Sequence, residues 1–219
     1  MTRTPTSLPR VLPERIFHVV EEANWPSVQR DGLLPARSLL DRALGPTAGP
    51  VASRTHRPRA LDLPCGTRLR DQAPMPPALL ARCLLPPLTP EDWYALVNAG
   101  VYFWTREDRL RRHLSALRRT KQRILVLDGP RLAAAYRDQA FVTPFNVGSA
   151  RRRPSPRGPA TFVAYAAWHR TAWRTEHPAP ASGRPPSHPP AELVIRAPIP
   201  DAMGFVTDIL SADIARQAA

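Results

Sequence analysis

The fold is decided near the N-terminus by the segment Arg15-Ile-Phe-His-Val-Val-Glu-Glu-Ala-Asn24-Trp-Pro-Ser-Val-Gln-Arg-Asp-Gly32. It begins with a β-branched and aromatic run that predicts a strand over residues 15–20. Asn24 then offers an N-cap and Pro26 a first-turn proline, so a short helix is expected to follow and to stop at Gly32. The segment therefore predicts a compact unit of strand, turn and helix, with His18 inside the strand.

Further along the chain, the same signals predict short strands carried between helices. The predicted helices cover residues 38–44, 76–85, 89–98, about 105–119 and 131–136. The predicted strands cover residues 101–104, 123–128 and 191–196. Residues 161–168 are expected to form either a strand or a helix. Residues 203–210 are expected to form the last element. Residues 45–64, 143–158 and 175–190 are expected to be irregular, with Pro- and Arg-rich loops. The fold class is α+β, with a flexible tail over residues 1–13 and a single domain over residues 14–219.

Composition narrows the class of protein. With 219 residues, of which 43% are hydrophobic and 22% charged, the chain is long enough to bury a core and too apolar for a disordered protein. No apolar run reaches the ~18 residues of a membrane span, and the polar start lacks the apolar segment of a signal peptide. Cys65 and Cys83 form no zinc-binding pattern. We therefore expect a cytoplasmic protein with reduced thiols, no metal and no membrane contact.

The net charge of +13 comes from 31 basic residues, of which only Lys121 is a lysine. Such use of arginine is typical of a GC-rich genome and needs no functional reason. A positive field of this size also attracts polyanions such as DNA or RNA, in a salt-dependent manner. The high net charge therefore has two equally weighted explanations, incidental basicity and contact with nucleic acid. The candidate phosphate-contacting segment is a basic run that comprises Arg151, Arg152, Arg153 and Arg157.

The patterns of several common enzyme classes are missing. The sequence has neither G-x-x-x-x-G-K-[ST] nor G-x-G-x-x-G, and it lacks the serine hydrolase pattern G-x-S-x-G and the zinc protease pattern H-E-x-x-H. What remains are polar side chains in or beside apolar strands, namely His18, Tyr102 and Glu192. Taken singly, each has an ordinary explanation, as a core histidine, a packed aromatic ring and a surface carboxylate.

Taken together and in this order, the three positions resemble the motifs of the ADP-ribosyltransferase fold. His18 in a first strand, followed by Asn24-Trp-Pro-Ser and by Gly32-Leu, is similar to the first motif. Val101-Tyr-Phe-Trp104 resembles the second, an aromatic strand before a helix. Pro190-Ala-Glu-Leu-Val-Ile-Arg-Ala-Pro-Ile-Pro200 resembles the third, a catalytic glutamate at the start of a strand. The nearest likeness is to the DarT-type nucleic-acid ADP-ribosyltransferases and their bacterial relatives, and it spans residues 16–200.

This resemblance implies that the protein cleaves the nicotinamide N-glycosidic bond of NAD and transfers ADP-ribose to DNA or RNA, without a metal. Glu192 would hold the ribose 2′-hydroxyl and stabilise an oxocarbenium-like transition state. His18 would bind the adenosine ribose, and Tyr102 would stack on the nicotinamide. The further candidate NAD-binding residues are Arg70, for the pyrophosphate or the acceptor, and Asn146 and Ser149, for the nicotinamide side. A surface arginine and ordinary turn residues are the alternatives for these three positions.

Two segments depart from the family pattern. Thr105-Arg-Glu-Asp108 follows the second motif, where the DNA-modifying members carry a Pro/Ser/Met segment. The loop before the glutamate, residues 175–190, often selects the acceptor in this fold. Here it holds six prolines, and it is either an idle linker or a contact for a polyanion through His177, Arg184 and His188.

The resemblance also implies a toxin or defence effector with a partner antitoxin. The alternatives are the same fold with a protein acceptor, NAD hydrolysis or RNA 2′-phosphotransfer, and a non-catalytic, basic nucleic-acid-binding protein. An enzyme requires that His18, Tyr102 and Glu192 converge on one cleft. A binding protein has no such requirement.

Overall fold

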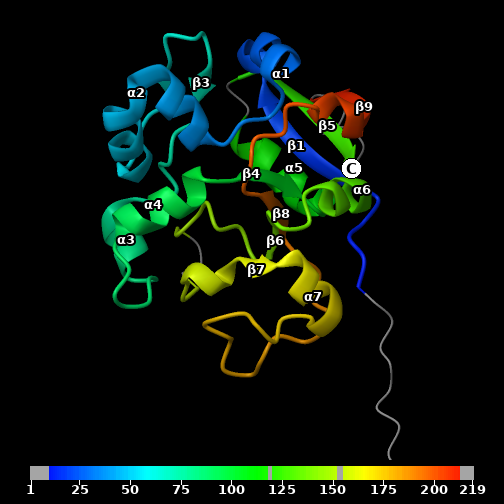
Figure 1. Ribbon diagram of the computed structural model, residues 1–219. Coiled ribbons are helices and arrows are strands. Elements are labelled where there is room, and N and C mark those ends of the chain that lie inside the picture. Colours follow the sequence, from blue (N-terminus) through cyan, green and yellow to red (C-terminus); the bar gives the residue numbers. More distant parts are fainter. Residues whose placement is uncertain (1–9, 118–119, 152–154, 213–219) are drawn as a thin grey trace, which may run out of the picture.

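The computed structural model describes residues 10–117, 120–151 and 155–212 (Figure 1). Part of the predicted tail, the predicted helix end at residues 118–119, and Arg152 and Arg153 lie outside the described residues. Within them, no helix has both the length and the apolar character that crossing a membrane requires. Cys65 is exposed and Cys83 is buried, and both are free thiols.

A seven-stranded sheet in the order β7-β6-β8-β4-β1-β5-β9 forms the centre of the fold, and every neighbouring pair is antiparallel. Its strands are β1 (Arg15–Glu21), β4 (Val101–Trp104), β5 (Gln122–Asp128), β6 (Ala140–Thr143), β7 (Val163–Ala164), β8 (Glu192–Ile195) and β9 (Val206–Ser211). A separate hairpin pairs β2 (Leu61–Asp62) with β3 (Arg68–Leu69). The α+β class expected from the sequence is confirmed.

Helices cover both faces of this sheet. They are α1 (Trp25–Asp31), α2 (Ala36–Arg54), α3 (Pro77–Ala81), α4 (Pro90–Asn98), α5 (Glu107–Ala116), α6 (Gly129–Ala135) and α7 (Tyr165–Thr171), with 3-10 turns at Glu22–Asn24, Pro159–Thr161 and Ala202–Phe205. Helices α1, α6 and α7 pack on the face that carries Ile16, Phe103 and Leu193. On the opposite face, α5 packs against Phe17 and Val19, and α4 packs near Tyr102 and Val194. Side chains of β1 and β4 therefore alternate between two separate cores.

Most predicted elements are confirmed, and the largest error is in residues 45–64. The sequence predicts a loop there, whereas α2 continues to Arg54 across a kink at Gly45, where φ is 79°. Glycine adopts this conformation without strain, and Pro46 then occupies the start of the second helical piece, where a missing N–H is tolerated. A Cβ on Gly49 would lie 2.6 Å from the Cα atom of Asp41. The two pieces of α2 are therefore packed by a close approach that no local pattern reveals.

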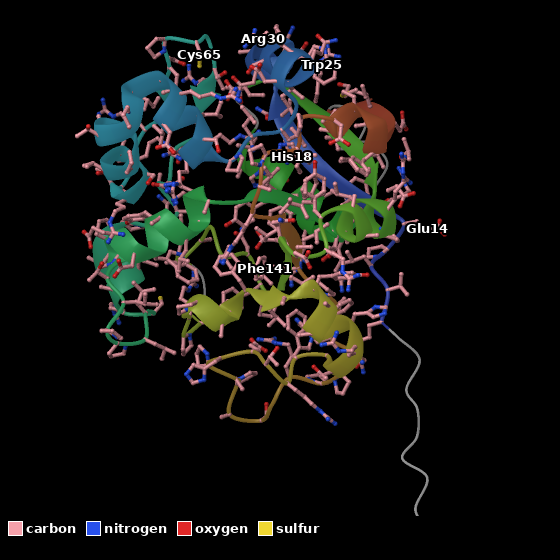
Figure 2. All side chains as sticks on the ribbon, in the orientation of Figure 1. Glu14, His18, Trp25, Arg30, Cys65 and Phe141 are labelled. Atoms are coloured by element: carbon pink, nitrogen blue, oxygen red, sulfur yellow. The ribbon has the colours of Figure 1, made fainter. Side chains whose placement is uncertain are left out.

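A short interruption of the sheet positions the candidate site. Strands β1 and β4 are paired at Phe17 and Trp104, whereas β1 pairs with β5 along its whole length, from Arg15 to Glu21. Beyond Phe17, the edge of β1 that faces β4 is occupied by side chains instead of a backbone ladder. His18 is the first residue at this break, and Figure 2 shows it near the centre of the molecule.

Candidate functional site

The three motif strands lie side by side, in the order β8-β4-β1. Trp104 of β4 is directly opposite Glu192 of β8, and Tyr102 is opposite Val194. Strands that are far apart in the chain therefore bring Glu192, Tyr102 and His18 onto three neighbouring strands. Two strand spacings, about 10 Å, separate the strands of His18 and Glu192.

The side chain of His18 bridges the break between β1 and β4. Its Nδ1 lies 2.8 Å from the carbonyl oxygen of Tyr102, and its ring lies 5.4 Å from that of Phe103. Burial lowers the pKa of His18 to about 4. The hydrogen bond to Tyr102 raises this pKa, and the positive charge of Arg70 lowers it further. The ring is therefore neutral at pH 7. Because a carbonyl only accepts, Nδ1 carries the proton and Nε2 is left as an acceptor.

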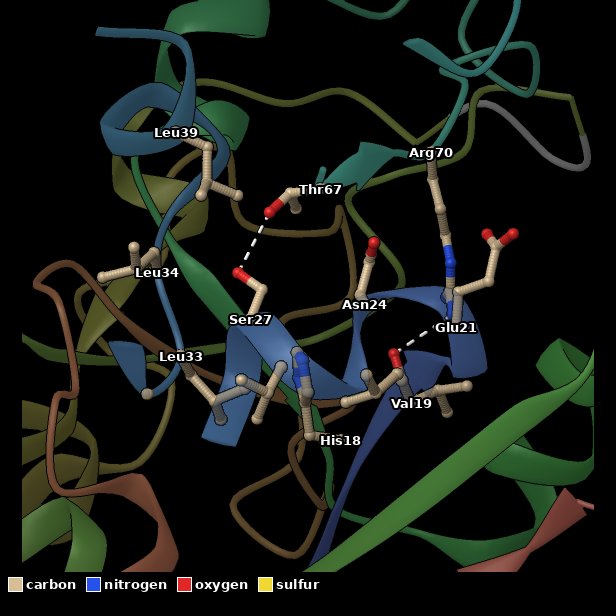
Figure 3. A pocket seen from close by; sticks show the side chains of 13 residues that line it. His18, Val19, Glu21, Asn24, Ser27, Leu33, Leu34, Leu39, Thr67 and Arg70 are labelled. Atoms are coloured by element: carbon tan, nitrogen blue, oxygen red, sulfur yellow. Dashed lines mark hydrogen bonds between the residues drawn. The ribbon is translucent and has the colours of Figure 1, made fainter. Parts of the chain in front are cut away.

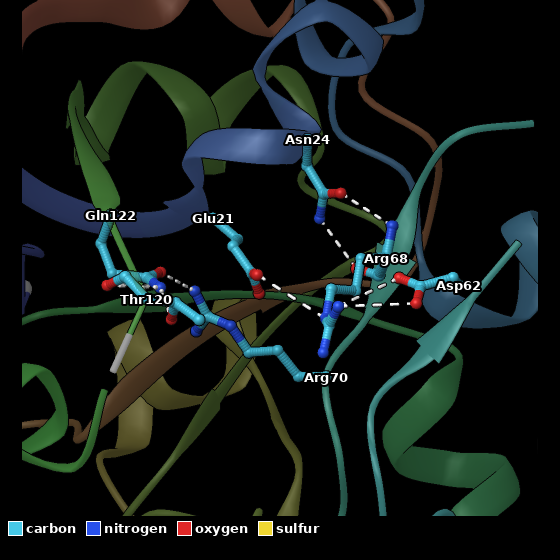
Figure 4. Close-up of polar contacts among 7 residues, drawn as sticks. All are labelled: Glu21, Asn24, Asp62, Arg68, Arg70, Thr120 and Gln122. Carbon is cyan, nitrogen blue, oxygen red and sulfur yellow. Dashed lines mark hydrogen bonds and ion pairs between the residues drawn. The ribbon is translucent and has the colours of Figure 1, made fainter. Parts of the chain in front are cut away.

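Arg70 follows β3 and is held by neutral acceptors. Its guanidinium donates to the carbonyl of Val19, to Oε1 of Gln122 and to Nε2 of His113. Thr120 accepts from the amide of Gln122 and so orients it (Figure 4). Burial lowers the pKa of Arg70 to about 10. No carboxylate of the described residues lies within 4 Å of this guanidinium, so its positive charge is available to an anion.

The position of Arg70 depends on Asn24 at the start of α1. The Asn24 amide donates to the carbonyl of Arg68 at 2.8 Å and accepts from its N–H at 2.7 Å (Figure 4). The sequence predicts that Asn24 caps α1 with its side chain, and this prediction is wrong. The side chain instead joins the start of the helix to β3. The Arg68 side chain pairs with Glu21 and Asp62, so it does not compete for a ligand of Arg70.

His18 and Arg70 share a cavity of about 110 Å³ (Figure 3). Its polar lining also includes Asn24, Ser27, Thr67 and Glu21, which pairs with Arg68 at 3.7 Å, and the Thr67 hydroxyl donates to that of Ser27 at 3.0 Å. Pockets that enclose a whole small molecule measure roughly 300–1,000 Å³. This cavity therefore suits one part of a longer ligand, such as a sugar with an adjoining phosphate.

Glu192 is only 4% exposed. One oxygen, Oε2, accepts from the Thr143 hydroxyl at 2.7 Å and from the N–H of Val147 at 3.2 Å. Burial raises its pKa to about 7, although both hydrogen bonds and the charges of Arg109 and Arg157 oppose the shift. A carboxyl group with this pKa exchanges a proton near neutral pH, which is a property of catalytic acids and bases.

The loop over residues 144–149 covers Glu192, so Asn146 and Ser149 lie near it. Asn146 accepts from the N–H of Gly148, and the Ser149 carbonyl accepts from Arg157. Arg157 corrects the sequence prediction: it is 1% exposed and donates to the carbonyls of Val147, Ser149 and Ser155. It cannot contact nucleic-acid phosphates, and instead it fixes the loop that donates to Glu192.

The structure does not bring all three motif residues to one face of the sheet. Tyr102 and Glu192 share one face, because Trp104 lies opposite Glu192 and Tyr102 is two residues before Trp104. His18 lies on the other face, beside Phe103. The Tyr102 hydroxyl donates to the Val97 carbonyl, and burial raises the pKa of this phenol. The expected convergence on one cleft is therefore wrong: His18 lines a cavity that neither Tyr102 nor Glu192 lines, and those two residues lie on the opposite face of the sheet. The candidate site thus has two parts.

Arg70 connects these two parts. It lines the cavity beside His18, and it contacts His113 of α5, whose ring lies 5.4 Å from that of Trp104. Trp104 is in turn opposite Glu192. The break between β1 and β4 is thus the place where the two faces approach each other.

The other predicted polyanion contacts differ in accessibility. Arg151 is exposed and donates to the Ala73 carbonyl. His177 is exposed, whereas Arg184 forms a bidentate pair with the buried Glu176, at 2.6 Å for each bond. His188 lies 3.1 Å from the Pro144 carbonyl. The loop over residues 175–190 is therefore tied to the Glu192 region and is not an idle linker.

Sequence reasoning missed Thr143 and Arg109. Thr143 ends β6, a strand that the sequence did not predict, and Arg109 stands in a helix with four other charged residues, from which no local pattern distinguishes it. Both contact or face Glu192 only because distant segments meet there. No group of three or more His, Cys, Asp or Glu side chains suited to a metal gathers in the described ranges.

Changing Glu192 to Gln is expected to remove a pH dependence of stability. The pKa of Glu192 is about 7 in the fold against an ordinary value of 4.5, so its favourable contribution is complete below pH 4.5 and is lost as the pH rises through 7. The loss amounts to about 3 kcal/mol. Urea unfolding at several pH values measures it.

The exposed Glu14 offers the control, because Glu14→Gln should keep the wild-type profile. The lowered pKa values of His18 and His113 make the free energy of unfolding rise with pH at acid pH. This rise is common to the wild type, Glu192→Gln and Glu14→Gln. Parallel profiles for wild type and Glu192→Gln would contradict the assigned pKa.

Comparison with known proteins gives one family. The model of a Family of unknown function (DUF7002) matches residues 14–206. No curated protein and no solved structure matches the chain. The matched range includes His18, Arg70, Tyr102 and Glu192, so the whole candidate site lies within the family's common region.

Proposed function

We propose that this chain, which belongs to the Family of unknown function (DUF7002), is an NAD-dependent ADP-ribosyltransferase with a nucleic-acid acceptor. The observation that carries the proposal is the strand order β8-β4-β1, which lines up Glu192, Tyr102 and His18 on neighbouring strands. The proposal also includes a cytoplasmic location, where NAD and nucleic acids are both available, and a role as a toxin or defence effector.

The two parts of the site suit the two ends of NAD. The unprotonated Nε2 of His18 can accept from a ribose hydroxyl, and Arg70, whose guanidinium makes no direct ion pair among the described residues, can bind the pyrophosphate. From this cavity, an extended dinucleotide covers the about 10 Å between the outer motif strands. We place its nicotinamide ribose near Glu192, which lies on the other face of the sheet and one strand beyond the break between β1 and β4.

In the proposed reaction, the bond between C1′ of the ribose and the nicotinamide nitrogen breaks. The electron pair leaves with neutral nicotinamide, and positive charge develops on the ribose. The Glu192 carboxylate stabilises this charge and accepts from the 2′-hydroxyl. A nucleophilic nitrogen or oxygen of the acceptor then attacks C1′, and Glu192 takes up the proton that the acceptor loses.

The pH dependence of the rate follows from this role. Only the ionised form of Glu192 stabilises the developing charge, so kcat/KM for NAD, which reports the groups of the free enzyme, is expected to rise with pH through an apparent pKa of about 7. Nicotinamide release at a series of pH values measures the profile. An acid limb at the ordinary pKa of 4.5 would argue against Glu192 as the group that acts.

The proposal is tested by nicotinamide release from NAD with DNA, with RNA and without an acceptor. Release that depends on nucleic acid supports it. Release without an acceptor indicates NAD hydrolysis, and release with cell protein alone indicates a protein acceptor. Salt-sensitive nucleic-acid binding with no NAD consumption would replace the proposal by a non-catalytic binding protein. A cyclic phosphate product from 2′-phosphorylated RNA would replace it by 2′-phosphotransfer.

A further inference from the structure

Arg109 of α5 has a buried Nε atom without a hydrogen-bond partner among the described residues. Its charge and that of Glu192 shift each other's pKa, yet no ion pair joins the two side chains within 4 Å. The two charges therefore interact without direct contact between the side chains. Buried donors in proteins are almost always paired, so an unpaired one beside a candidate site calls for a ligand atom.

Three arginines carry positive charge near Glu192 or near Tyr102, its neighbour on the same face of the sheet. Arg109, Arg157 and Arg196 are partly or fully buried, and burial lowers the pKa of each. None of the three has a carboxylate within 4 Å in the described part of the chain. The acidic groups whose charges act on Arg109 are Asp108, which already pairs with Arg106 and Arg112, and Glu192, which carries only part of a charge near pH 7. The balance of charge favours an anion.

The three arginines differ in what they can still bind. Arg157 spends its donors on backbone carbonyls. Arg196 also keeps two buried donors, Nε and Nη2, without a partner among the described residues, but it lies between the rings of Phe141 and Phe162, at 4.5 and 4.4 Å, and its charge interacts with Tyr102. Arg109 has neither constraint, and it stands in the first turn of the helix that follows Trp104, the residue opposite Glu192.

We propose that Arg109 binds a phosphate group of the ligand that reaches Glu192. A guanidinium fork matches the spacing of phosphate oxygens and forms charge-assisted hydrogen bonds to them. The inference rests on the proposed function only for the source of the phosphate, which is the NAD pyrophosphate or the acceptor backbone. The phosphate chemistry itself follows from the charge and the unpaired donor.

Isothermal titration with inorganic pyrophosphate, ADP-ribose and a short single-stranded oligonucleotide tests the proposal. Arg109→Gln is expected to weaken binding of at least one probe by about 10- to 100-fold, because a charge-assisted bond is lost. Arg109→Lys keeps the charge without the fork and should lose less. The matched control is Arg112→Gln on the same helix, because Arg112 is 72% exposed and pairs with Asp108; its effect should stay within about twofold.

The probes separate the two sources of phosphate. A loss confined to pyrophosphate and ADP-ribose assigns Arg109 to the dinucleotide, and a loss confined to the oligonucleotide assigns it to the acceptor. Equal affinities of Arg109→Gln and Arg112→Gln for every probe, or no binding by the wild type, would overturn the proposal. If Arg109→Gln does not fold, the ¹⁵N shift of Arg109 Nε in the wild type decides, since pyrophosphate should move it. These binding results stand even if NAD is never consumed.

Discussion

Glu192→Gln is expected to slow ADP-ribose transfer by about 10²–10⁴-fold, which is the range for removing a group that acts in the transition state. Glutamine can replace the protonated carboxyl in its bonds to Thr143 and Val147, but it carries no charge for the developing cation and cannot accept the acceptor's proton. The affinity for NAD should change little, because the ground state carries less of this charge. Steady-state rates and NAD titration measure the two quantities.

Glu14→Gln removes the same charge at an exposed position and should keep the wild-type rate. A loss in Glu192→Gln that is caused only by misfolding would lower its thermal stability, whereas we expect that variant to be more stable above pH 7. A fully active Glu192→Gln would exclude the role that we assign to this residue.

Arg157→Met is expected to lower the free energy of unfolding by about 3–5 kcal/mol. It removes one donor from each of the carbonyls of Val147, Ser149 and Ser155, of which Val147 keeps the Trp93 indole N–H at 3.4 Å; a buried polar group left unpaired costs about 1–3 kcal/mol. Relief from burying a charge offsets part of this loss. The guanidinium also lies 5.5 Å from the ring of Trp93 and 5.1 Å from that of Phe145, which adds contacts that methionine only partly restores. Urea unfolding measures the change.

Arg157→Met should also move the acid limb of the rate to higher pH. The Arg157 charge and the Val147 N–H both lower the pKa of Glu192, and the variant removes the first and loosens the second. Arg151→Met is the control, because Arg151 is an exposed arginine of the same segment and contacts a single carbonyl, that of Ala73. A destabilisation no larger than that of Arg151→Met would show that Arg157 does not fix this loop.

Local patterns predicted the fold where the local signal was strong. The apolar run at residues 15–20 forms a strand, and the helices predicted over residues 89–98 and about 105–119 appear as α4 and α5. The second half of α2 was missed because its helix is stabilised by packing at Gly49 and not by propensity. Strand β6 was missed because its short run gains its pairing only from β7 and β8.

The candidate site was predictable only in part, because its geometry also depends on contacts between distant segments. Polar residues in apolar strands drew attention to His18, Tyr102 and Glu192, and the sheet does place their strands together. The face of each side chain depends on the register between strands, and a shift of one residue reverses it. The sequence does not contain that register. It also does not show that Arg157 is buried or that Nε of Arg109 has no hydrogen-bond partner among the described residues, because both depend on contacts between distant segments.

The most direct test of the central claim is transfer of label from NAD to nucleic acid. The NAD should carry its label on the adenylate half, so that only attached ADP-ribose marks the acceptor. We expect the wild type and Glu14→Gln to label DNA or RNA and to release nicotinamide in equal amount, and Glu192→Gln to do neither at a comparable rate. Absence of label and of nicotinamide release in the wild type, with DNA, RNA and cell protein all present, would contradict the claim.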